Sequence, residues 1–453
     1  MHLYVGTGRE IGAYPYDNNK ERMSKLYNAG LKSAARLTAM AAGHLPENSS
    51  SKMVRFLRGR SNLLAKIRGE LGTAFRVPTI WVHASSLGEY AIARPIIAAL
   101  KRRHAGCRVV VSFFSPSGYE AVIRNPGQAD HVFYLPWDTP RNARDFIDAV
   151  KPDAALFMVS EYWHNYLSEL HRRNIPTYLV SALIREDSAF FKWYGGDYRR
   201  DLECYTHIFT PDIPSLENLR RLDDTRASIC GDPLFDNAAA IAASPWSNPA
   251  LDSFCQDRRV FVAGSVSDRR DAAMTTRLAN ENPDTRFIFV PHDISDRNIH
   301  SLSESLEHGS TRLSECSGDT DFSGVQSLIV DHVGDLPRLY RYGTWAYVGG
   351  GFTPYLHSVI EPTVYGIPVS FGPRIERKST PLRMIELGIG EKVENYEDLR
   401  DWFAGLRDNA PELARIRAAA SGYVEENLGA TDEIVSLIER DLKERGSLNR
   451  QKI

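Results

Sequence analysis

A carboxylate follows directly after an apolar strand pattern near residue 84. The segment WVHASSLGEYAIARP predicts a strand that ends at Ala84, a turn of small residues, and a helix that begins near Glu89. Gly88 permits a tight turn and close approach of a ligand, and the free N–H groups of a helix N-terminus suit an anionic or hydroxylic substrate. Glu89 at the mouth of a cleft could deprotonate an incoming hydroxyl. The alternative is an ordinary first-turn glutamate that interacts with the helix dipole.

Two further segments repeat this strand–turn–helix pattern. FFSPSGYE (113–120) is the next unit along the chain, and MVSEYWHNYL (158–167) again ends a strand pattern with a carboxylate. Three such units would aim polar groups at one edge of a parallel sheet, which a purely structural loop would not need. We therefore predict a ligand-binding surface at this edge, formed by Ser86, Gly88, Ser117, Gly118 and Glu161.

A glycine-rich turn in the second half indicates a phosphate-binding loop. The segment VGGGFTPYLHSVIEPTVYGIPVSFGPR places Gly349, Gly350 and Gly351 after a strand, where their N–H groups can approach a ligand. We expect a helix to begin near His357, with Glu361 one turn into it and able to accept hydrogen bonds from ribose hydroxyls. The turn does not match GxGxxG and has no Walker lysine, so neither a dinucleotide nor ATP is indicated.

Two more strand ends in the second half carry polar side chains. They are AGSVSDRRD (263–271) and VPHDI (290–294), and they make Ser265 and His292 candidates for contacts to a donor substrate. The alternatives are a helix cap for Ser265 and an ordinary loop histidine for His292.

The elements that must position these residues are parallel strands, which the sequence supplies in two runs. Apolar strand patterns alternate with helical stretches, so we predict two doubly wound, Rossmann-like α/β domains. Ligands bind at the carboxyl ends of parallel strands, so we expect the site in a cleft where the two domains face each other. The expected strands are 79–84, 108–114, 131–136, 154–159, 177–182, 206–211 and 227–231 in the first run, and 260–265, 286–291, 327–331, 345–350 and 368–373 in the second.

The domain boundaries follow from these runs and from shifts in composition. The expected parts are an extension that is non-native or disordered (1–22), a basic amphipathic region (23–75), a first Rossmann-like domain for the acceptor (76–240), a linker (241–258), a second Rossmann-like domain for the donor (259–425) and a C-terminal helix that crosses back to the first domain (426–453).

The basic region has two interpretations. A helical pattern after Met23 carries Lys32 and Arg36 in its middle, which makes a lipid-spanning helix costly. After Glu47 six cations precede the next acid, Glu70, with apolar residues between them. Such a stretch can lie on an anionic membrane surface, or it can pack on the body of the protein with a solvated basic face.

Composition excludes several classes of protein. The 453 residues are 43% hydrophobic and 25% charged, which is typical of an ordered protein with more than one domain. The formal net charge of −2 argues against a nucleic-acid partner. The five cysteines form no CxxC pair and no zinc-type cluster with histidine, so we expect reduced thiols and no metal site.

Taken together and in this order, the motifs resemble the 3-deoxy-D-manno-octulosonic acid (Kdo) transferases of Gram-negative lipopolysaccharide synthesis. The resemblance runs from about residue 26 to 430 and is densest at HASSLGE, FFSPSGYE, IPTYLVSALIRED…FFKWYG and GGGF…H…EP…YGIPVSFGP. The segments FFKWYG and FFSPSGYE are similar to those of the Bacteroidetes branch of the family.

The resemblance implies a glycosyltransferase B fold and an inverting transfer of Kdo. The donor would be CMP-Kdo, the acceptor a tetraacylated lipid A precursor (lipid IVA), and the enzyme would work at the cytoplasmic face of the inner membrane without a metal or other cofactor. By the family pattern Glu89 is the general base. The residues implied to bind the CMP moiety are Ser265, His292, Gly349, Gly350, Gly351, His357 and Glu361.

The sequence departs from the family pattern at three places. Many members have Thr-Glu-x-Trp-Pro-Asn where this chain has His164 in place of the proline. Many have His-Asn where this chain has His357-Ser358, and a basic residue where it has Pro291. The partner of the sugar carboxylate is therefore open, with four candidate cations: Arg185, Lys192, Arg374 and Lys378.

Two other functions remain open on the sequence. One is an enzyme of the same fold that uses another nucleotide sugar. The other is a degenerate protein that only binds a sugar nucleotide, against which the intact Glu89 and glycine loop argue.

Overall fold

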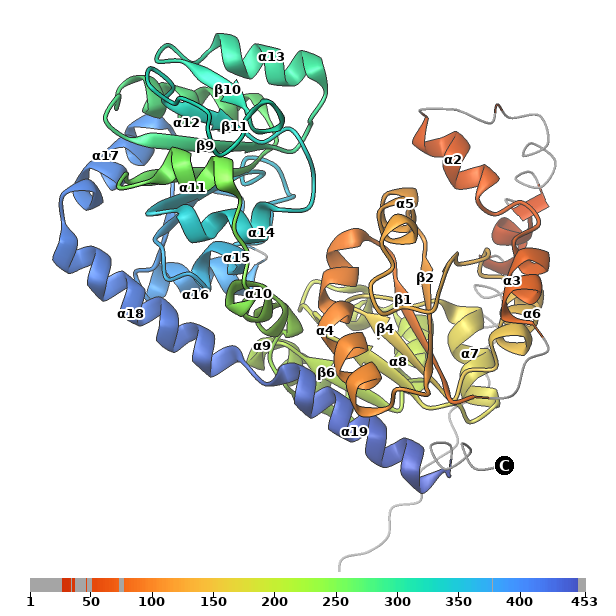
Figure 1. Ribbon diagram of the computed structural model, residues 1–453. Helices are drawn as coiled ribbons and strands as arrows, with labels where there is room; N and C mark the ends of the chain where they lie inside the picture. The colour runs from red at the N-terminus through yellow and green to blue at the C-terminus, as the bar shows by residue number, and fades with distance from the viewer. Residues whose placement is uncertain are drawn as a thin grey trace, which may run out of the picture. The chain divides into compact units, whose positions relative to one another are not determined.

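The computed structural model describes residues 27–33, 35–36, 46, 51–72, 77–376 and 378–446. They form two α/β domains, each built on one parallel sheet (Figure 1). The first domain extends to Ile229 and includes the chain from Leu437 onward, and the second extends from Cys230 to Ser436. The predicted extension 1–22 lies outside the described residues.

The first sheet has seven parallel strands in the order β3-β2-β1-β4-β5-β6-β7. Trp81 of β1 pairs with Val110 of β2 and Ala155 of β4, so β1 lies in the middle of the sheet. The strand order reverses between β1 and β4, which is the position where open α/β sheets bind ligands. The strands are β1 Thr79–Ala84, β2 Arg108–Phe113, β3 His131–Tyr134, β4 Ala154–Met158, β5 Thr177–Val180, β6 His207–Thr210 and β7 Ala227–Ile229.

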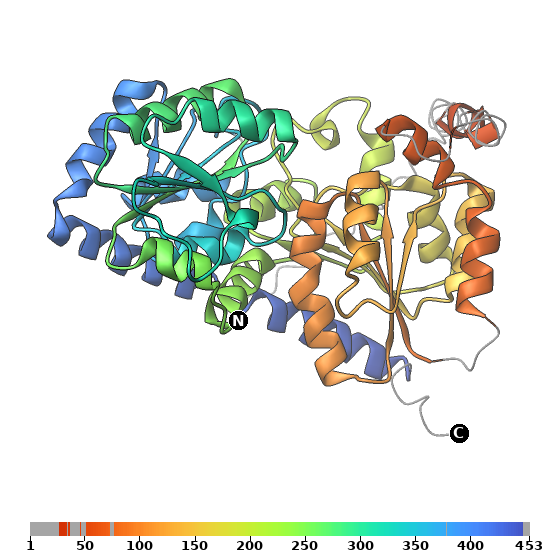
Figure 2. The same ribbon diagram turned by 45° about the horizontal axis from the view of Figure 1, so that its top comes forward.

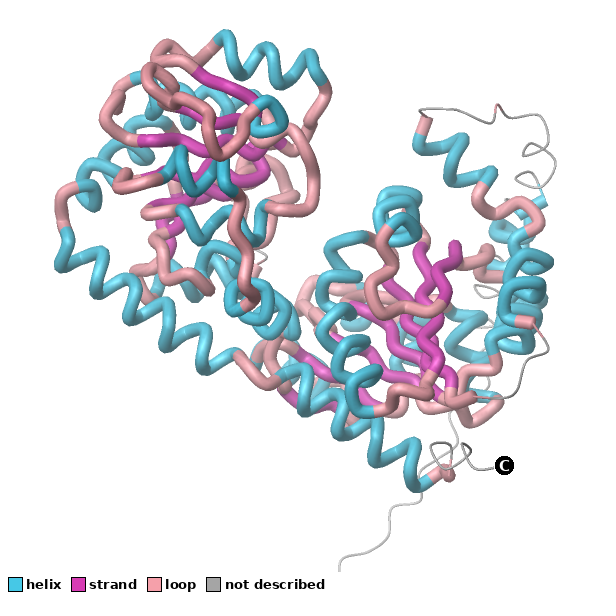
Figure 3. Tube along the Cα trace, viewed as in Figure 1, coloured by secondary structure: helices cyan, strands magenta, loops and turns pink. Residues whose placement is uncertain are grey.

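Helices cover both faces of this sheet, as the tube drawing shows (Figure 3). On one face α3 Leu63–Leu71, α6 Pro140–Val150 and α7 His164–Arg172 pack on Trp81, Phe157 and other buried strand residues. On the other, Tyr178 of β5 donates from its hydroxyl to Asp441 of α19, Ala430–Glu444, at 2.7 Å. The remaining connecting helices are α4 Leu87–Arg103, α5 Pro116–Arg124, α8 Gly196–Glu203 and α9 Ile213–Arg220.

The predicted basic region divides into two parts of different character. Helix α3 packs into the core through Leu63, Ile67 and Leu71, as the second interpretation required. Helix α2, Lys52–Arg58, has no buried residue, and Met53 on it is 65% exposed. No helix among the residues described is long and apolar enough to cross a membrane.

Arg60, two residues after α2, bonds the loops that follow two strands of the first sheet. Its guanidinium donates to the carbonyl oxygens of Phe114 at 2.7 Å and Leu135 at 3.1 Å, which follow β2 and β3. It also stacks on the Phe56 ring, 3.9 Å from the centroid. Burial lowers the pKa of Arg60 to about 10. The chain that leaves α2 is therefore fixed at the carboxyl edge of the first sheet.

The second sheet repeats the plan with the order β10-β11-β9-β8-β12-β13-β14, all parallel. Here the order reverses between β8 and β12. Figure 2 shows helices above and below this sheet. The strands are β8 Val260–Val266, β9 Arg286–Pro291, β10 Ser310–Arg312, β11 Ser327–Ile329, β12 Trp345–Val348, β13 Val369–Phe371 and β14 Gly390–Lys392.

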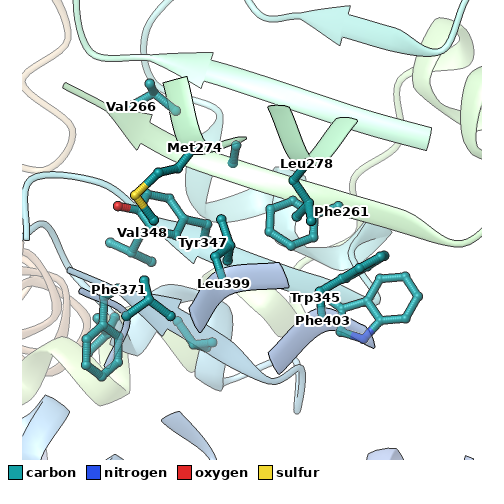
Figure 4. Close-up of a cluster of buried hydrophobic side chains, with 14 of the residues drawn as sticks. Phe261, Val266, Met274, Leu278, Trp345, Tyr347, Val348, Phe371, Leu399 and Phe403 are labelled. Carbon is teal, nitrogen blue, oxygen red and sulfur yellow. The ribbon is translucent and has the colours of Figure 1, made fainter. Parts of the chain in front are cut away.

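Alternation along β8 divides the core of the second domain in two. Phe261 and Ala263 face a cluster that includes Trp345, Leu399 and Phe403, with α12 Arg269–Asn280 and α17 Tyr396–Arg407 packed on it (Figure 4). Val260 and Val262 face the opposite cluster. Both faces are apolar because helices cover both, which explains the nearly continuous hydrophobic strand patterns.

The segment predicted as a linker, 241–258, is in part ordered core. It contains α11, Pro249–Cys255, whose Leu251 and Phe254 are buried against β8 and β11. It also contains the end of α10, Pro233–Ala243. The linker prediction was wrong because the many small and polar residues of this segment concealed three apolar positions spaced for one helix face.

Two strands were not predicted, and one helix is displaced. β10 and β14 are three-residue edge strands of mixed polarity, too short to give a periodic signal. The helix expected near His357 is α15, Ile360–Thr363, only four residues long, so Glu361 lies in its first turn. At the C-terminus α18 Ala410–Asn427 is followed by α19 Ala430–Glu444. Glu439 on α19 bonds His104 of the first domain at 2.8 Å.

Truncation of Phe254 tests whether α11 belongs to the core. Phe254→Ala should lower the stability of the second domain by about 3–5 kcal/mol, the range for large-to-small changes at buried aromatic positions. Gln256→Ala, an exposed neighbour, should change it by less than about 0.5 kcal/mol. Urea unfolding followed by circular dichroism measures both. Equal midpoints for the two variants would restore the linker interpretation.

Candidate active site

The first sheet brings two glutamates to its point of strand reversal. Glu89 follows β1 and Glu161 follows β4, and these strands are hydrogen-bonded neighbours. Their carboxyl ends therefore open at the same edge, which is the default ligand position of a doubly wound sheet. The predicted convergence of polar residues at this edge is realised for these two side chains.

Glu89 is held by the turn that precedes it. Ser86 is the N-cap of α4, and its hydroxyl faces the Glu89 backbone N–H at 3.4 Å and donates to Glu89 Oε1 at 3.3 Å. The Ser85 backbone N–H donates to Glu89 Oε2 at 2.5 Å. Glu89 thus does occupy the first turn of a helix, as the structural alternative required. The electrostatics of the site decide whether it is also reactive.

Glu161 lies in a buried setting that favours its charged form. The Trp163 indole N–H donates to Glu161 Oε2, and His83 Nε2 lies 3.6 Å from the same oxygen. Burial opposes the charge of Glu161, but bonds from His83, Ser85 and Trp163 outweigh it and hold its pKa below the ordinary value. Glu161 therefore stays ionised across the neutral range.

A relay inside the sheet orients His83. The Trp81 indole N–H, which can only donate, bonds Ser112 Oγ at 2.8 Å, and Ser112 Oγ lies 2.9 Å from His83 Nδ1. Because the Ser112 oxygen accepts from Trp81, the Ser112 hydroxyl can donate its own proton to His83 Nδ1. A neutral His83 then carries its ring proton on Nε2, which faces Glu161. His83 is fully buried, and Ser85 Oγ lies 3.4 Å from Nε2.

The ionised Glu161 raises the proton affinity of Glu89. Burial is the largest cause, the charge of Glu161 and a hydrogen bond between the two carboxyls add to it, and together they raise the pKa of Glu89 to about 8. Glu89 then holds the proton that the two carboxyl groups share. At pH 7 about a tenth of the Glu89 side chains are ionised. A carboxylate with a pKa near the working pH is a far stronger base than an exposed one.

The backbone before Glu161 is in an uncommon conformation. Val159, the residue after β4, has φ of +67°, a region that β-branched residues almost never adopt. Its N–H still donates to Val180 O at 2.7 Å, so the sheet holds it there. Strain of this kind clusters at functional sites, which is consistent with the position of Val159 two residues before Glu161.

The other predicted residues of this edge have more modest roles. Gly118 is buried, and a Cβ there would lie 2.6 Å from the Phe113 ring, so glycine allows α5 to approach the sheet. Ser117 is exposed and bonds Ser115 at 2.8 Å. Gly88 was expected to permit a tight turn, which was wrong. Its φ is not positive, and a Cβ would meet only Ser86 Oγ at 4.0 Å.

The second domain also gathers its predicted residues at a strand reversal. Ser265 is the next-to-last residue of β8 and lies at a bulge with φ of +51°, and the glycine loop follows the neighbouring strand β12. A Cβ on Gly349 would lie 2.1 Å from Ser265 O, and one on Gly351 would lie 2.5 Å from Gly372 N. The glycines are required first for the close packing of these loops. Ser265 is not a helix cap, because Asp268 caps α12.

Asp271 is the centre of this arrangement. It is fully buried, and its carboxylate accepts from Gly350 N–H at 2.9 Å, Ser267 N–H at 3.1 Å and the Tyr347 hydroxyl at 2.6 Å. Gly349 N–H donates to Gly264 O at 2.9 Å. Two of the three N–H groups expected to cradle a phosphate are therefore used within the protein. Gly351 N–H makes no hydrogen bond within the described part of the chain.

Two histidines and one glutamate complete the donor-side candidates. The rings of His292 and His357 lie 4.9 Å apart between centroids. Burial, with His292 as a lesser cause, lowers the pKa of His357 to about 4, so this ring is neutral at pH 7. Burial raises the pKa of Glu361 to about 7. Lys378 Nζ donates to Leu356 O at 2.8 Å, next to His357.

His164 replaces the proline of the family pattern without loss of the local structure. It is the first residue of α7, the helix position at which proline is most readily accommodated. Here its Nδ1 bonds Asp201 at 2.8 Å. The following Asn165 donates its side-chain amide to Asp138 O at 2.7 Å.

Sequence reasoning did not single out His83, Ser85 or Asp271 as parts of the site. His83 and Ser85 stand inside the HASSLGE motif, and Asp271 ends the segment AGSVSDRRD. An internal polar residue in an otherwise apolar strand was the available signal for His83. Asp271 had no local signal, because its role depends on β12.

Comparisons with known proteins find similar sequences in one enzyme family. A family model described as 3-deoxy-D-manno-octulosonic-acid transferase matches residues 41–237. The 3-deoxy-D-manno-octulosonic acid transferase of Chlamydia trachomatis is 25% identical over 71% of this chain and 77% of its own. That of Haemophilus influenzae is 24% identical over 83% of this chain and 90% of its own.

Among solved structures, a putative UDP-N-acetylglucosamine 2-epimerase from Listeria monocytogenes superposes with a TM-score of 0.60. The superposition covers 82% of this chain and 98% of the epimerase chain, at 14% sequence identity. The likeness therefore concerns the fold alone. Two Rossmann-like domains, each with its polar residues at a strand reversal, are the architecture of glycosyltransferase B enzymes. Within that class, residues 41–237 and the relatives named above make the chain similar to the 3-deoxy-D-manno-octulosonic acid transferase family, whose members are glycosyltransferases.

Removal of the Glu161 charge should shift the pH dependence of the reaction. A base at Glu89 would act only when ionised, so kcat/KM should rise with pH through about 8 in the native protein. Glu161→Gln removes the like charge, lowers the pKa of Glu89 and should move the rising limb to lower pH. Turnover measured across pH for both forms is the test. A limb that stays in place would show that the two carboxyls are not coupled.

Proposed function

We propose that this enzyme transfers Kdo from CMP-Kdo to a lipid A precursor, with inversion at the anomeric carbon and Glu89 as the base. The observation that carries the proposal is the pair of carboxyls at the β1–β4 reversal. One of them, Glu161, is ionised, and the other has a pKa of about 8. Similarity to the Kdo transferase family supports the choice of donor and product.

The proposed reaction is a single displacement. The acceptor hydroxyl loses its proton to the ionised form of Glu89, its oxygen attacks the anomeric carbon of Kdo, and the bond to the cytidylate oxygen breaks as the new bond forms. The leaving group departs as cytidine monophosphate. Glu161 and His83 maintain the proton affinity of Glu89 and do not touch the reacting atoms in this scheme.

The donor would lie against the second domain. Four groups near the end of β8 and around the glycine loop could bind it. They are the hydroxyl of Ser265, the imidazoles of His292 and His357, and the backbone N–H of Gly351. A neutral His357 would act as a hydrogen-bond partner for the cytidylate, and not as a cation. Glu361 would accept from the ribose. At the N-terminus of α12 the N–H groups of Arg270 and Asp271 already donate to the Asp268 side chain, and that of Asp268 donates to Asp271, so these three are not available for the phosphate.

The acceptor implies a place of action at a membrane. We propose that the enzyme works at the cytoplasmic face of the inner membrane and that α2 contributes to docking. This helix carries Lys52, Arg55 and Arg58, has no buried residue and exposes Met53. Cations beside an exposed apolar side chain favour a surface of anionic lipid.

Product analysis tests the proposed transfer and its base. The full chain, incubated with CMP-Kdo and the lipid A precursor, should give a product heavier by one or more Kdo units in mass spectrometry. Glu89→Gln should lower kcat about 10²–10⁴-fold, the usual contribution of a positioned base. Glu217→Gln, an exposed glutamate of α9, is the matched control and should keep full turnover.

Two outcomes would overturn the proposal in different ways. Consumption of a UDP-sugar but not of CMP-Kdo, in parallel assays, would leave the fold and reject the donor. Full turnover by Glu89→Gln would leave the donor and reject the base.

Asp271 provides a test on the donor side. Asp271→Asn keeps the shape but loses the charge that accepts from Gly350, Ser267 and Tyr347, so the glycine loop should lose its position. Charge-assisted hydrogen bonds contribute about 1.5–3 kcal/mol, so KM for CMP-Kdo should rise about 10–100-fold. KM for the acceptor should change little. Asp284→Asn, at an exposed loop of the same domain, is the control. An equal rise in both KM values would indicate general unfolding.

A further inference from the structure

One exposed aromatic turn in the first domain is not used by the proposed chemistry. It spans Ser188–Gly196 between β5 and α8, and Trp193 at its tip is 95% exposed. That is the highest exposure of any large hydrophobic side chain among the residues described. Tyr194 beside it is 49% exposed, with its ring edge-on to Trp193 at 5.5 Å.

The turn is a fixed structure that presents this tryptophan. Gly195 N–H donates to Lys192 O at 2.9 Å, and Lys192 N–H donates to Ala189 O at 3.1 Å. A Cβ on Gly195 would lie 2.1 Å from Ala189 O, so the loop closes tightly around the glycine. Arg199 of α8 donates to Phe190 O at 2.5 Å. Such a closed turn could bury its tryptophan locally, yet it holds Trp193 outward.

The turn lies on the edge of the sheet that carries the reactive carboxyls. It follows β5, whose carboxyl end neighbours that of β4. Phe190 at its base is 4% exposed and packs on Tyr162, ring to ring at 5.0 Å. Tyr162 is the residue after Glu161. Helix α2 is fixed to the same edge, because Arg60 bonds the carbonyls that follow β2 and β3.

The chemistry of the turn fits the boundary between a lipid bilayer and water. No acid occurs from Ser188 to Gly196, and Lys192 is the one cation there. Tryptophan and tyrosine concentrate at membrane interfaces because an apolar ring and a polar N–H or O–H can each reach their preferred medium. An adjacent lysine can extend its ammonium group to the lipid phosphates.

We infer that the turn Ser188–Gly196 is a bilayer contact of this enzyme, with Trp193 entering the headgroup region beside the edge that carries Glu89. The inference rests on the proposed lipid acceptor, because an enzyme with a membrane-embedded substrate must bring its reactive edge to the bilayer. It adds to α2 a second contact, from a different part of the chain. Between them the two would orient the edge towards the lipid.

Sedimentation with vesicles tests the inference without any transfer reaction. The full chain is mixed with vesicles of equimolar phosphatidylcholine and phosphatidylglycerol, and bound protein is measured. Trp193→Ala should weaken binding at least about tenfold, from the apolar area of one aromatic side chain. Trp193→Phe should keep most of it. Tyr355→Ala, at a 78% exposed aromatic of the second domain, is the control and should bind like the native chain.

Fluorescence gives a second and independent measurement. Vesicles that contain brominated phosphatidylcholine should quench part of the native tryptophan emission, and Trp193→Phe should abolish that part. Unchanged sedimentation of Trp193→Ala, or equal quenching of Trp193→Phe and the native chain, would overturn the inference. Because neither experiment contains a sugar donor, vesicle binding that depends on Trp193 would stand even if Kdo transfer failed.

Discussion

The repulsion between two carboxyl groups at one strand reversal is the constraint around which the first domain is organised. Glu89 and Glu161 cannot both be charged at low cost in a largely buried setting. The protein resolves this with unequal surroundings. Glu161 receives the Trp163 indole and His83, and Glu89 receives one backbone N–H and a serine. The proton therefore stays on Glu89, which becomes a carboxyl of raised pKa next to a permanent negative charge.

This division depends on groups far from any substrate. The orientation of His83 comes from Ser112 on the neighbouring strand, and that of Ser112 from Trp81 in the core. Val159, two residues before Glu161, has an unfavourable backbone conformation that the sheet holds in place. Parallel pairing of β1, β2 and β4 fixes all of these positions at once. The chemistry of the site is thus a property of the sheet as much as of the loops.

The second domain uses a buried carboxylate in the opposite way. Asp271 accepts hydrogen bonds from the glycine loop, from Ser267 and from Tyr347, so its charge is satisfied internally. It organises the loop and leaves few N–H groups for a ligand. The donor-side candidates that remain are consequently side chains and one N–H group, where the sequence had indicated a cradle of three. In each domain a carboxylate at a strand reversal determines the state of the groups beside it. Glu161 keeps the proton on Glu89, and Asp271 occupies the Gly350 N–H group.

The sequence by itself determined the two parallel α/β domains, most strand positions, the Kdo transferase resemblance and the placement of Glu89, because these depend on local periodicity and on contiguous motifs. It did not determine the order in α11, the edge strands β10 and β14 or the shortness of α15, since those depend on packing against distant elements. Only the tertiary structure decided which glutamate holds the proton, that the Gly350 N–H donates to Asp271, and that Trp193 is exposed. Each of these follows from groups that are distant in the chain and brought together by strand pairing or by the closure of a turn, and no local pattern encodes that proximity.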